Sequence, residues 1–184
     1  MVQALFRCSG VPKLVTIEKD KIVFRRATID DVPTLIDCRI RFLNELYNHS
    51  EDEKTRILRK SLVEYLTRAI PSRDFISWIA EYDGRIIATS GMVIWEIPGR
   101  YGGVESGKQG YLLNFYTFPE ARRMGIATRL LKELIKEAQL LGIKSLHLHA
   151  SKYGINIYKK AGFTEPEMPE LVLQLNQTNA KAVQ

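Results

Sequence analysis

The sequence predicts a single mixed α/β domain built around a central sheet. Strand-type and helix-type hydrophobic patterns follow one another along the chain, and no Pro/Gly/Ser-rich linker separates them. Two long strand-type segments flank a tight-turn dipeptide, and a later strand-type segment leads directly into a long amphipathic helix. With 184 residues, 45% of them hydrophobic and 26% charged, the chain can bury a core without disulfides or metals.

The first part of the chain predicts a strand followed by two helices. Residues 21–28 carry the alternating pattern of a strand, and Asp30 is placed to cap the first helix. The second helix covers residues 52–69, and Pro71 ends it. The apolar faces of the two helices comprise Val32, Leu35, Ile36, Phe42, Leu43, Leu46 and Tyr47, and then Ile57, Leu58, Leu62, Tyr65, Leu66 and Ile70.

A β-hairpin is the clearest local prediction in the middle of the chain. Residues 74–82 and 85–97 flank Asp83-Gly84, a dipeptide that suits the positive φ angles of a tight turn. Residues 98–110 hold five of the twelve glycines, so we expect an irregular loop there. Residues 111–118 predict the next strand.

The last part of the chain alternates helices and strands. The spacing of its apolar residues predicts a helix over 124–141 that ends at Gly142. A strand over 144–150, a short helix over 153–161 and a final strand over 171–175 follow.

The ends of the chain and its charge set broad limits. We expect an N-terminal extension over 1–20, the domain over 21–176 and a C-terminal tail over 177–184. No apolar stretch approaches the roughly 18 residues of a membrane span, and the start lacks a signal-peptide pattern, so we expect a cytoplasmic protein with no membrane partner. The net charge of +6 favours an anionic partner, for which nucleic acid, a membrane surface and a phosphorylated cofactor all qualify.

Cysteines and histidines do not predict a metal site. Cys8 and Cys38 are too few and too far apart for a disulfide framework, so we expect free thiols. His147 and His149 lie two residues apart on a strand and share one face, but no third ligand stands at a suitable spacing. We expect both to be structural histidines beneath a helix.

The stretch RRMGIATRLL, residues 122–131, carries the strongest chemical signal. It follows a strand and opens an amphipathic helix, so the free N–H groups of residues 123–128 would point outward along the helix axis toward an anion. Gly125 would let an anion approach the backbone closely. The alternative is an ordinary start of a surface helix, and this stretch alone does not decide between them.

A second motif near the C-terminus supports the anion site. It consists of Asn156, then Tyr158 two residues later, then the pair Gly162-Phe163. Together the two motifs resemble the GNAT superfamily of acyl-CoA-dependent N-acyltransferases. Its [QR]-x-x-G-x-[GA] loop is matched by Arg122, Gly125 and Ala127, and its second motif by Asn156, Tyr158, Gly162 and Phe163. Arg123 and Met124 depart from the residues frequent at their positions, although a loop that acts through main-chain N–H groups tolerates such changes.

The resemblance implies a mixed central sheet whose fourth and fifth strands splay apart, with acetyl-CoA as co-substrate. The backbone of Phe115, Tyr116 and Thr117 would hold the pantetheine arm and polarise the thioester. The pyrophosphate would lie on Arg122, Arg123, Met124, Gly125, Ile126, Ala127 and Thr128. Asn156 would reach the cofactor, and Tyr158 would act as general acid toward the leaving sulfur.

The resemblance leaves the acceptor side open. It implies an amine acceptor, with a small molecule as the first hypothesis and a peptide or protein amine as the second, and it allows a homodimer. No carboxylate lies in residues 111–118, where many relatives place one; Glu96 and Glu105 are nearest but are more typical of surface charges. A non-catalytic acyl-CoA-binding module is a rival reading. A nucleic-acid partner is not expected, because only net charge supports it and Trp78 and Trp95 fall on hairpin strands.

Overall fold

The computed structural model describes residues 17–98, 107–168 and 170–173. The chain divides into two compact units, Met1–His149 and Ala150–Gln184, which are described separately. None of the helices in the described ranges is both long and apolar enough to cross a membrane.

The first unit is built on a five-stranded sheet with the order β1-β2-β3-β4-β5. The strands are β1 Val23–Arg26, β2 Phe75–Tyr82, β3 Arg85–Ile97, β4 Gly107–Thr117 and β5 Ser145–Leu148. Neighbouring strands are antiparallel except for β4 and β5, which pair in parallel. Asp83 (φ 50°) and Gly84 (φ 70°) make the tight turn between β2 and β3, which confirms the predicted hairpin.

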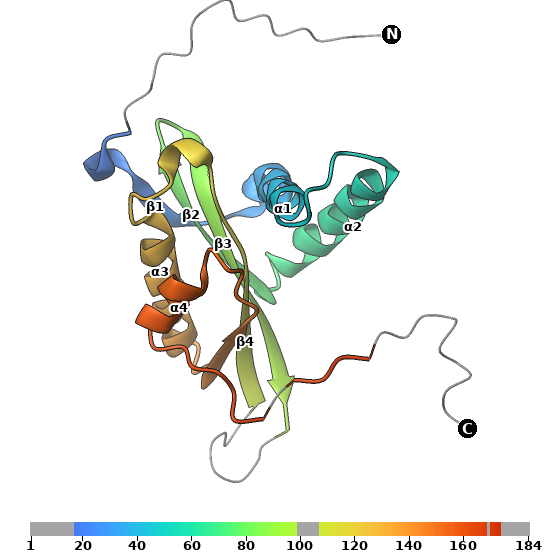
Figure 1. Cartoon of the computed structure of the whole chain (residues 1–184), viewed down its shortest axis with the longest axis vertical. Coiled ribbons are helices and arrows are strands. Elements are labelled where there is room, and N and C mark those ends of the chain that lie inside the picture. The colour runs from blue at the N-terminus through green and yellow to red at the C-terminus, as the bar shows by residue number, and fades with distance from the viewer. Residues whose placement is uncertain (1–16, 99–106, 169, 174–184) are drawn as a thin grey trace, which may run out of the picture. The chain divides into compact units, whose positions relative to one another are not determined.

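Helices cover both faces of this sheet (Figure 1). On one face, α1 Val32–Tyr47 and α2 Glu53–Ala69 pack on a core that includes Ile36, Ile40 and Leu66. On the other face, α3 Ile126–Leu140 packs through residues such as Ile126 and Leu130. Short 3-10 turns at Lys19–Lys21, Ile29–Asp31 and Pro119–Ala121 complete the unit, and the second unit contains α4 Ile155–Lys160.

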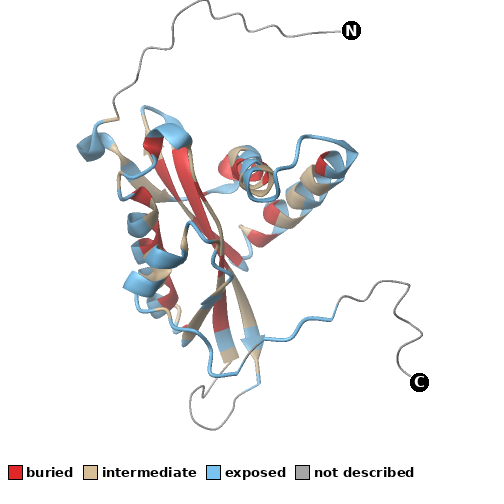
Figure 2. Cartoon of the chain, in the orientation of Figure 1, coloured by how far each residue is buried: buried red, intermediate tan, exposed pale blue. Residues whose placement is uncertain are grey.

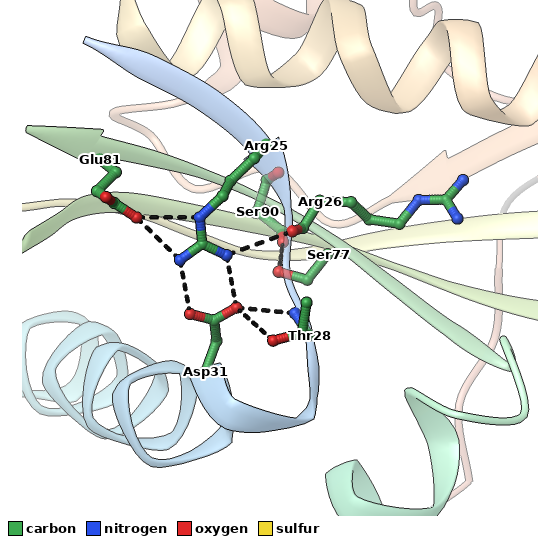
Figure 3. A network of polar contacts seen from close by, with 7 residues as sticks. All are labelled: Arg25, Arg26, Thr28, Asp31, Ser77, Glu81 and Ser90. Atoms are coloured by element: carbon green, nitrogen blue, oxygen red, sulfur yellow. Dashed lines mark hydrogen bonds and ion pairs between the residues drawn. The ribbon is translucent and has the colours of Figure 1, made fainter. Parts of the chain in front are cut away.

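Asp31, and not the predicted Asp30, stands at the N-cap of α1, and its side chain bonds back to the preceding 3-10 turn instead of to the helix. The Asp31 carboxylate accepts a hydrogen bond from the backbone N–H of Thr28 at 2.8 Å and two more from the Arg25 guanidinium at 2.8 and 2.9 Å (Figure 3). Arg25 also donates to Glu81 of β2 at 3.0 Å. The 3-10 turn Ile29–Asp31 takes up Asp30 and moves the start of α1 to Val32.

The outer ends of α1 and α2 lie outside the core, which corrects part of the predicted apolar faces. Leu46, Tyr47 and Ile57 are exposed, while the buried residues of α2 lie mainly near its C-terminal end (Figure 2). Apolar periodicity identifies the inner face of a helix, but it does not say how far the helix extends past the sheet.

The predicted glycine loop is shorter than expected, because residues 107–110 belong to β4. Glycine is needed here for close packing: a Cβ at Gly107 would lie 2.0 Å from the Ile97 carbonyl oxygen. A Cβ at Gly110 would lie 2.7 Å from Leu146 and 2.8 Å from the Met92 sulfur. Residues 99–106 lie outside the described part of the chain.

The predicted final strand is wrong over the residues that can be checked. Leu171, Val172 and Leu173 are exposed and are not part of a strand, while residues 174 and 175 lie outside the described ranges. Alternating apolar residues form a strand only where a neighbouring backbone pairs with them.

Candidate functional site

A β-bulge in β4 distorts the centre of the sheet. The register between β3 and β4 shifts beside Ser90, where Asn114 and Phe115 together occupy the place of one residue. Asn114 has a left-handed backbone (φ 58°), and its carbonyl accepts a hydrogen bond from the Thr89 hydroxyl at 3.1 Å. The side-chain oxygen of Asn114 is buried and finds no hydrogen-bond partner among the described residues. A buried polar atom of this kind is typical of a site whose ligand completes the bonding.

Beyond the bulge, one edge of β4 lacks a neighbouring strand. Residues 109–112 pair with 145–148 of β5, and within the described ranges no strand pairs with β4 on this side from 113 to 117. The N–H of Phe118 donates to the Ile87 carbonyl of β3 at 3.0 Å, so the polar backbone groups of Thr117 point the other way, toward this open edge. The predicted splay of the fourth and fifth strands is therefore confirmed.

The loop before α3 leaves backbone donors unused. Gly125 precedes the helix with φ 83°, and a Cβ there would meet no atom within 4 Å. The first helical bond runs from the Arg129 N–H to the Gly125 carbonyl at 3.1 Å, so the N–H groups of residues 126–128 in the first turn have no acceptor within the helix. Free donors at a helix N-terminus and open space above a glycine fit a phosphate group.

Glu45 of α1 connects β4 with the loop before α3, although no sequence motif pointed to it. Its Oε1 accepts a hydrogen bond from the Tyr116 hydroxyl and its Oε2 one from the Arg122 guanidinium, both at 2.7 Å. Arg122 also donates through Nε to the Thr117 carbonyl at 2.9 Å. The first residue of the predicted phosphate loop thus uses its side chain to join α1 to the edge of β4.

Burial raises the pKa of the Tyr116 phenol further above neutral pH. Removal of the phenol from water, and then its hydrogen bond to Glu45, raise the pKa of Tyr116 to about 12. At neutral pH the hydroxyl therefore stays protonated and serves as a donor to the carboxylate. Glu45 lies between apolar helix positions, and no local pattern in the sequence shows that it reaches β4.

Asn156 and Tyr158 lie on the short helix α4 of the second unit. Asn156 is exposed, and Tyr158 is half-buried, with its ring at 5.8 Å and 72° from that of Phe163. Burial raises the pKa of Tyr158 to about 12, so its hydroxyl keeps its proton at neutral pH. This protonated phenol has the form that a general acid requires.

The acids nearest in sequence are not placed at the open edge. Glu96 is exposed and lies opposite Lys108 in the register of β3 and β4, at the far end of these strands. At roughly 3.3 Å per residue this position is about 20 Å from the bulge. Glu105 lies outside the described residues. Among the described residues, Glu45 is the carboxylate that hydrogen-bonds a side chain from the splayed part of β4.

The two strand histidines differ from the expectation of helix-covered residues, because both are exposed. His147 packs on Trp95 and His149 on Tyr111, each with ring centroids 5.7 Å apart. The helices on this face pack against earlier residues of the strands, such as Val93 of β3, and leave this end uncovered. Elsewhere the prediction for Cys38 is confirmed, since it is a buried free thiol.

Comparison with known proteins decides the family. The model of the Acetyltransferase (GNAT) family matches residues 43–163. The chain belongs to the GNAT acetyltransferase family. As a GNAT protein it resembles a predicted acetyltransferase from Clostridium acetobutylicum solved with acetyl-CoA, at 31% identity and a TM-score of 0.75 over 87% of this chain and 99% of that one.

A second GNAT structure agrees in fold. A GCN5-related N-acetyltransferase from Ralstonia eutropha JMP134 aligns at 22% identity and a TM-score of 0.73, over 83% of this chain and 98% of that one. A comparison with curated protein sequences gives no match. The family, the fold, the acyltransferase class and acetyl-CoA as co-substrate are thus as the sequence predicted.

Proposed function

We propose that this GNAT protein is an N-acetyltransferase that transfers the acetyl group of acetyl-CoA to a primary amine, with a small molecule as the acceptor. The observation that carries the proposal is the combination, in one unit, of an open edge of β4 with a cluster of unused N–H donors at the start of α3. An extended ligand with an anionic group at one end fits this combination. A peptide or protein amine is the second candidate acceptor.

The cofactor-binding residues are assigned by combining the family motif with this geometry. The N–H groups at the start of α3 and the neighbouring loop would hold the pyrophosphate; this set is Arg122, Arg123, Met124, Gly125, Ile126, Ala127 and Thr128. The backbone near Phe115, Tyr116 and Thr117 would hold the pantetheine arm, with Thr117 contributing the groups that face the open edge. Asn156 is assigned to the cofactor by motif alone.

Acetyl-CoA supplies a thioester whose carbonyl carbon bonds to the amine nitrogen while its carbon–sulfur bond breaks. Tyr158 donates its phenolic proton to the leaving sulfur, and the phenol then recovers a proton from solvent. The raised pKa of Tyr158 keeps that proton in place across neutral pH. An amine that arrives protonated loses one proton before it attacks and a second once the carbon–nitrogen bond has formed, and both leave through water or through a base on the acceptor side.

Substitution of Tyr158 by Phe tests the catalytic role. We expect turnover to fall at least tenfold, about 1.4 kcal/mol of barrier, with unchanged affinity for acetyl-CoA, because only a proton donor is removed. Release of free thiol across a panel of amines measures turnover, and calorimetry measures binding of acetyl-CoA. Tyr153→Phe, an exposed tyrosine of the same unit, is the matched control.

Two results would contradict parts of this proposal. Unchanged turnover in Tyr158→Phe would remove that residue from the mechanism. Acetyl-CoA binding without thiol release for any amine would favour a non-catalytic acyl-CoA-binding module instead.

A further inference from the structure

We propose that Glu45 binds the protonated amine of the acceptor at the open edge of β4, so that the enzyme selects amines that are cationic at neutral pH. This inference rests on the proposed function, and it assigns a residue and a charge state to the acceptor side. It also explains how a GNAT protein without an acidic residue at 111–118 places a carboxylate near the reacting groups.

The position of Glu45 follows from two hydrogen bonds made by a single guanidinium. Arg122 donates to the Glu45 carboxylate at 2.7 Å and to the Thr117 carbonyl at 2.9 Å. The guanidinium of Arg122 thus bridges the Glu45 carboxylate and the Thr117 carbonyl, which faces the open edge. Its second oxygen is held by Tyr116, the neighbour of Thr117 in β4, so both carboxylate oxygens are fixed beside the same strand.

The carboxylate keeps room for a further donor. A carboxylate accepts about four hydrogen bonds, and those from Tyr116 and Arg122 account for two of them. The side chain of Glu45 is 50% exposed, so an ammonium group can approach it from solvent.

The surroundings of Glu45 suit a small cationic ligand. Glu45 lines a surface depression of about 510 Å³ beside α1, together with Asn44, Arg41, Glu51 and the ion pair of Asp37 with Arg59 at 2.6 Å. Asp37 and Arg59 balance one another, and among the other charged lining residues Glu45 and Glu51 outweigh Arg41. A charge-assisted hydrogen bond to Glu45 would therefore favour an ammonium over a neutral amine of the same shape.

Paired acceptors of similar shape and different charge test the inference. Benzylamine is cationic at neutral pH and benzhydrazide is neutral. Initial rates of thiol release at saturating acetyl-CoA give kcat and KM for both acceptors, in the wild type, Glu45→Gln, Glu45→Asp and the surface control Glu64→Gln. Thermal unfolding of each variant confirms that it is folded.

We expect Glu45→Gln to raise the KM for benzylamine at least tenfold and to change that for benzhydrazide less than twofold. Glu45→Asp keeps the charge and should recover part of the benzylamine affinity, and Glu64→Gln should behave as the wild type. An equal loss for both acceptors, or no loss for either, would overturn the inference and leave the proposed function intact. A wild type that acetylates benzhydrazide but not benzylamine would also overturn the inference and leave the proposed function intact. No thiol release with either acceptor would overturn the inference and the proposed function together.

Discussion

Two arginine-centred networks join the sheet to α1, and they differ in how completely their polar groups are satisfied. Around Arg25, the Asp31 side chain is only 9% exposed and accepts bonds from the guanidinium and from the Thr28 N–H (Figure 3). Around Arg122, the Glu45 side chain is 50% exposed and lies beside a strand edge that no described strand pairs with. The same chemistry therefore holds the fold together in one place and leaves ligand-binding capacity in the other.

The contrast predicts that removing one partner of the largely buried pair lowers stability, whereas the exposed pair contributes little and stays accessible to a ligand. Residue type does not separate the two cases, since each consists of an arginine that bridges a carboxylate and a second acceptor. Burial and remaining hydrogen-bond capacity separate them.

Gly125→Glu should have the largest effect. It tests whether the loop next to Arg122 binds an anion. Added bulk and negative charge in the open space before α3 should weaken acetyl-CoA binding at least a thousandfold, about 4 kcal/mol, without unfolding the domain. Calorimetry measures the affinity. Gly142→Glu is a matched control, because Gly142 also has a positive φ (70°) and open space at Cβ. A folded Gly125→Glu protein with normal affinity would refute the phosphate site.

Asp31→Asn should have the next largest effect, and on stability alone. Removing the partner of a partly buried guanidinium should lower the free energy of unfolding by about 2–3 kcal/mol, with KM values unchanged in the folded fraction. The exposed counterpart Glu45→Gln should cost under about 1 kcal/mol. Urea unfolding of both variants measures the difference, and equal losses would break the comparison.

Acid should reveal the same contrast. The hydrogen bond from Arg25 lowers the pKa of Asp31 below its ordinary value of 3.8. A lowered pKa contributes stability above the ordinary value, and that contribution is lost as the pH falls below it. Wild-type stability should therefore decline below about pH 4 more steeply than that of Asp31→Asn.

Tyr116→Phe should have a small effect, about 1 kcal/mol, because it removes one hydroxyl and keeps the ring. The pKa of Tyr116 is raised to about 12 from 10.0, so its contribution to stability is complete below pH 10 and is lost as the pH rises to 12. The free energy of unfolding should fall more steeply over this range in the wild type than in the variant. Parallel curves would show that Tyr116 does not titrate with folding.

Much of the fold could be predicted because its signals are local. The Asp83-Gly84 turn, the helix that ends before Gly142 and the loop around Gly125 depend on the conformations of neighbouring residues. The same reasoning failed at residues 107–110, where glycines serve close packing between strands, and at 171–173, which lack a strand partner.

The sequence by itself determined the family, the order of the elements and the loop that would hold the phosphates, because each is encoded in short contiguous motifs. Only the tertiary structure decided that Glu45 reaches Tyr116 and Arg122, that β4 bulges at Asn114, and that Arg25 reaches Glu81. These features depend on contacts between residues far apart in the chain, and side-chain periodicity carries no information about which distant partner a polar group will meet.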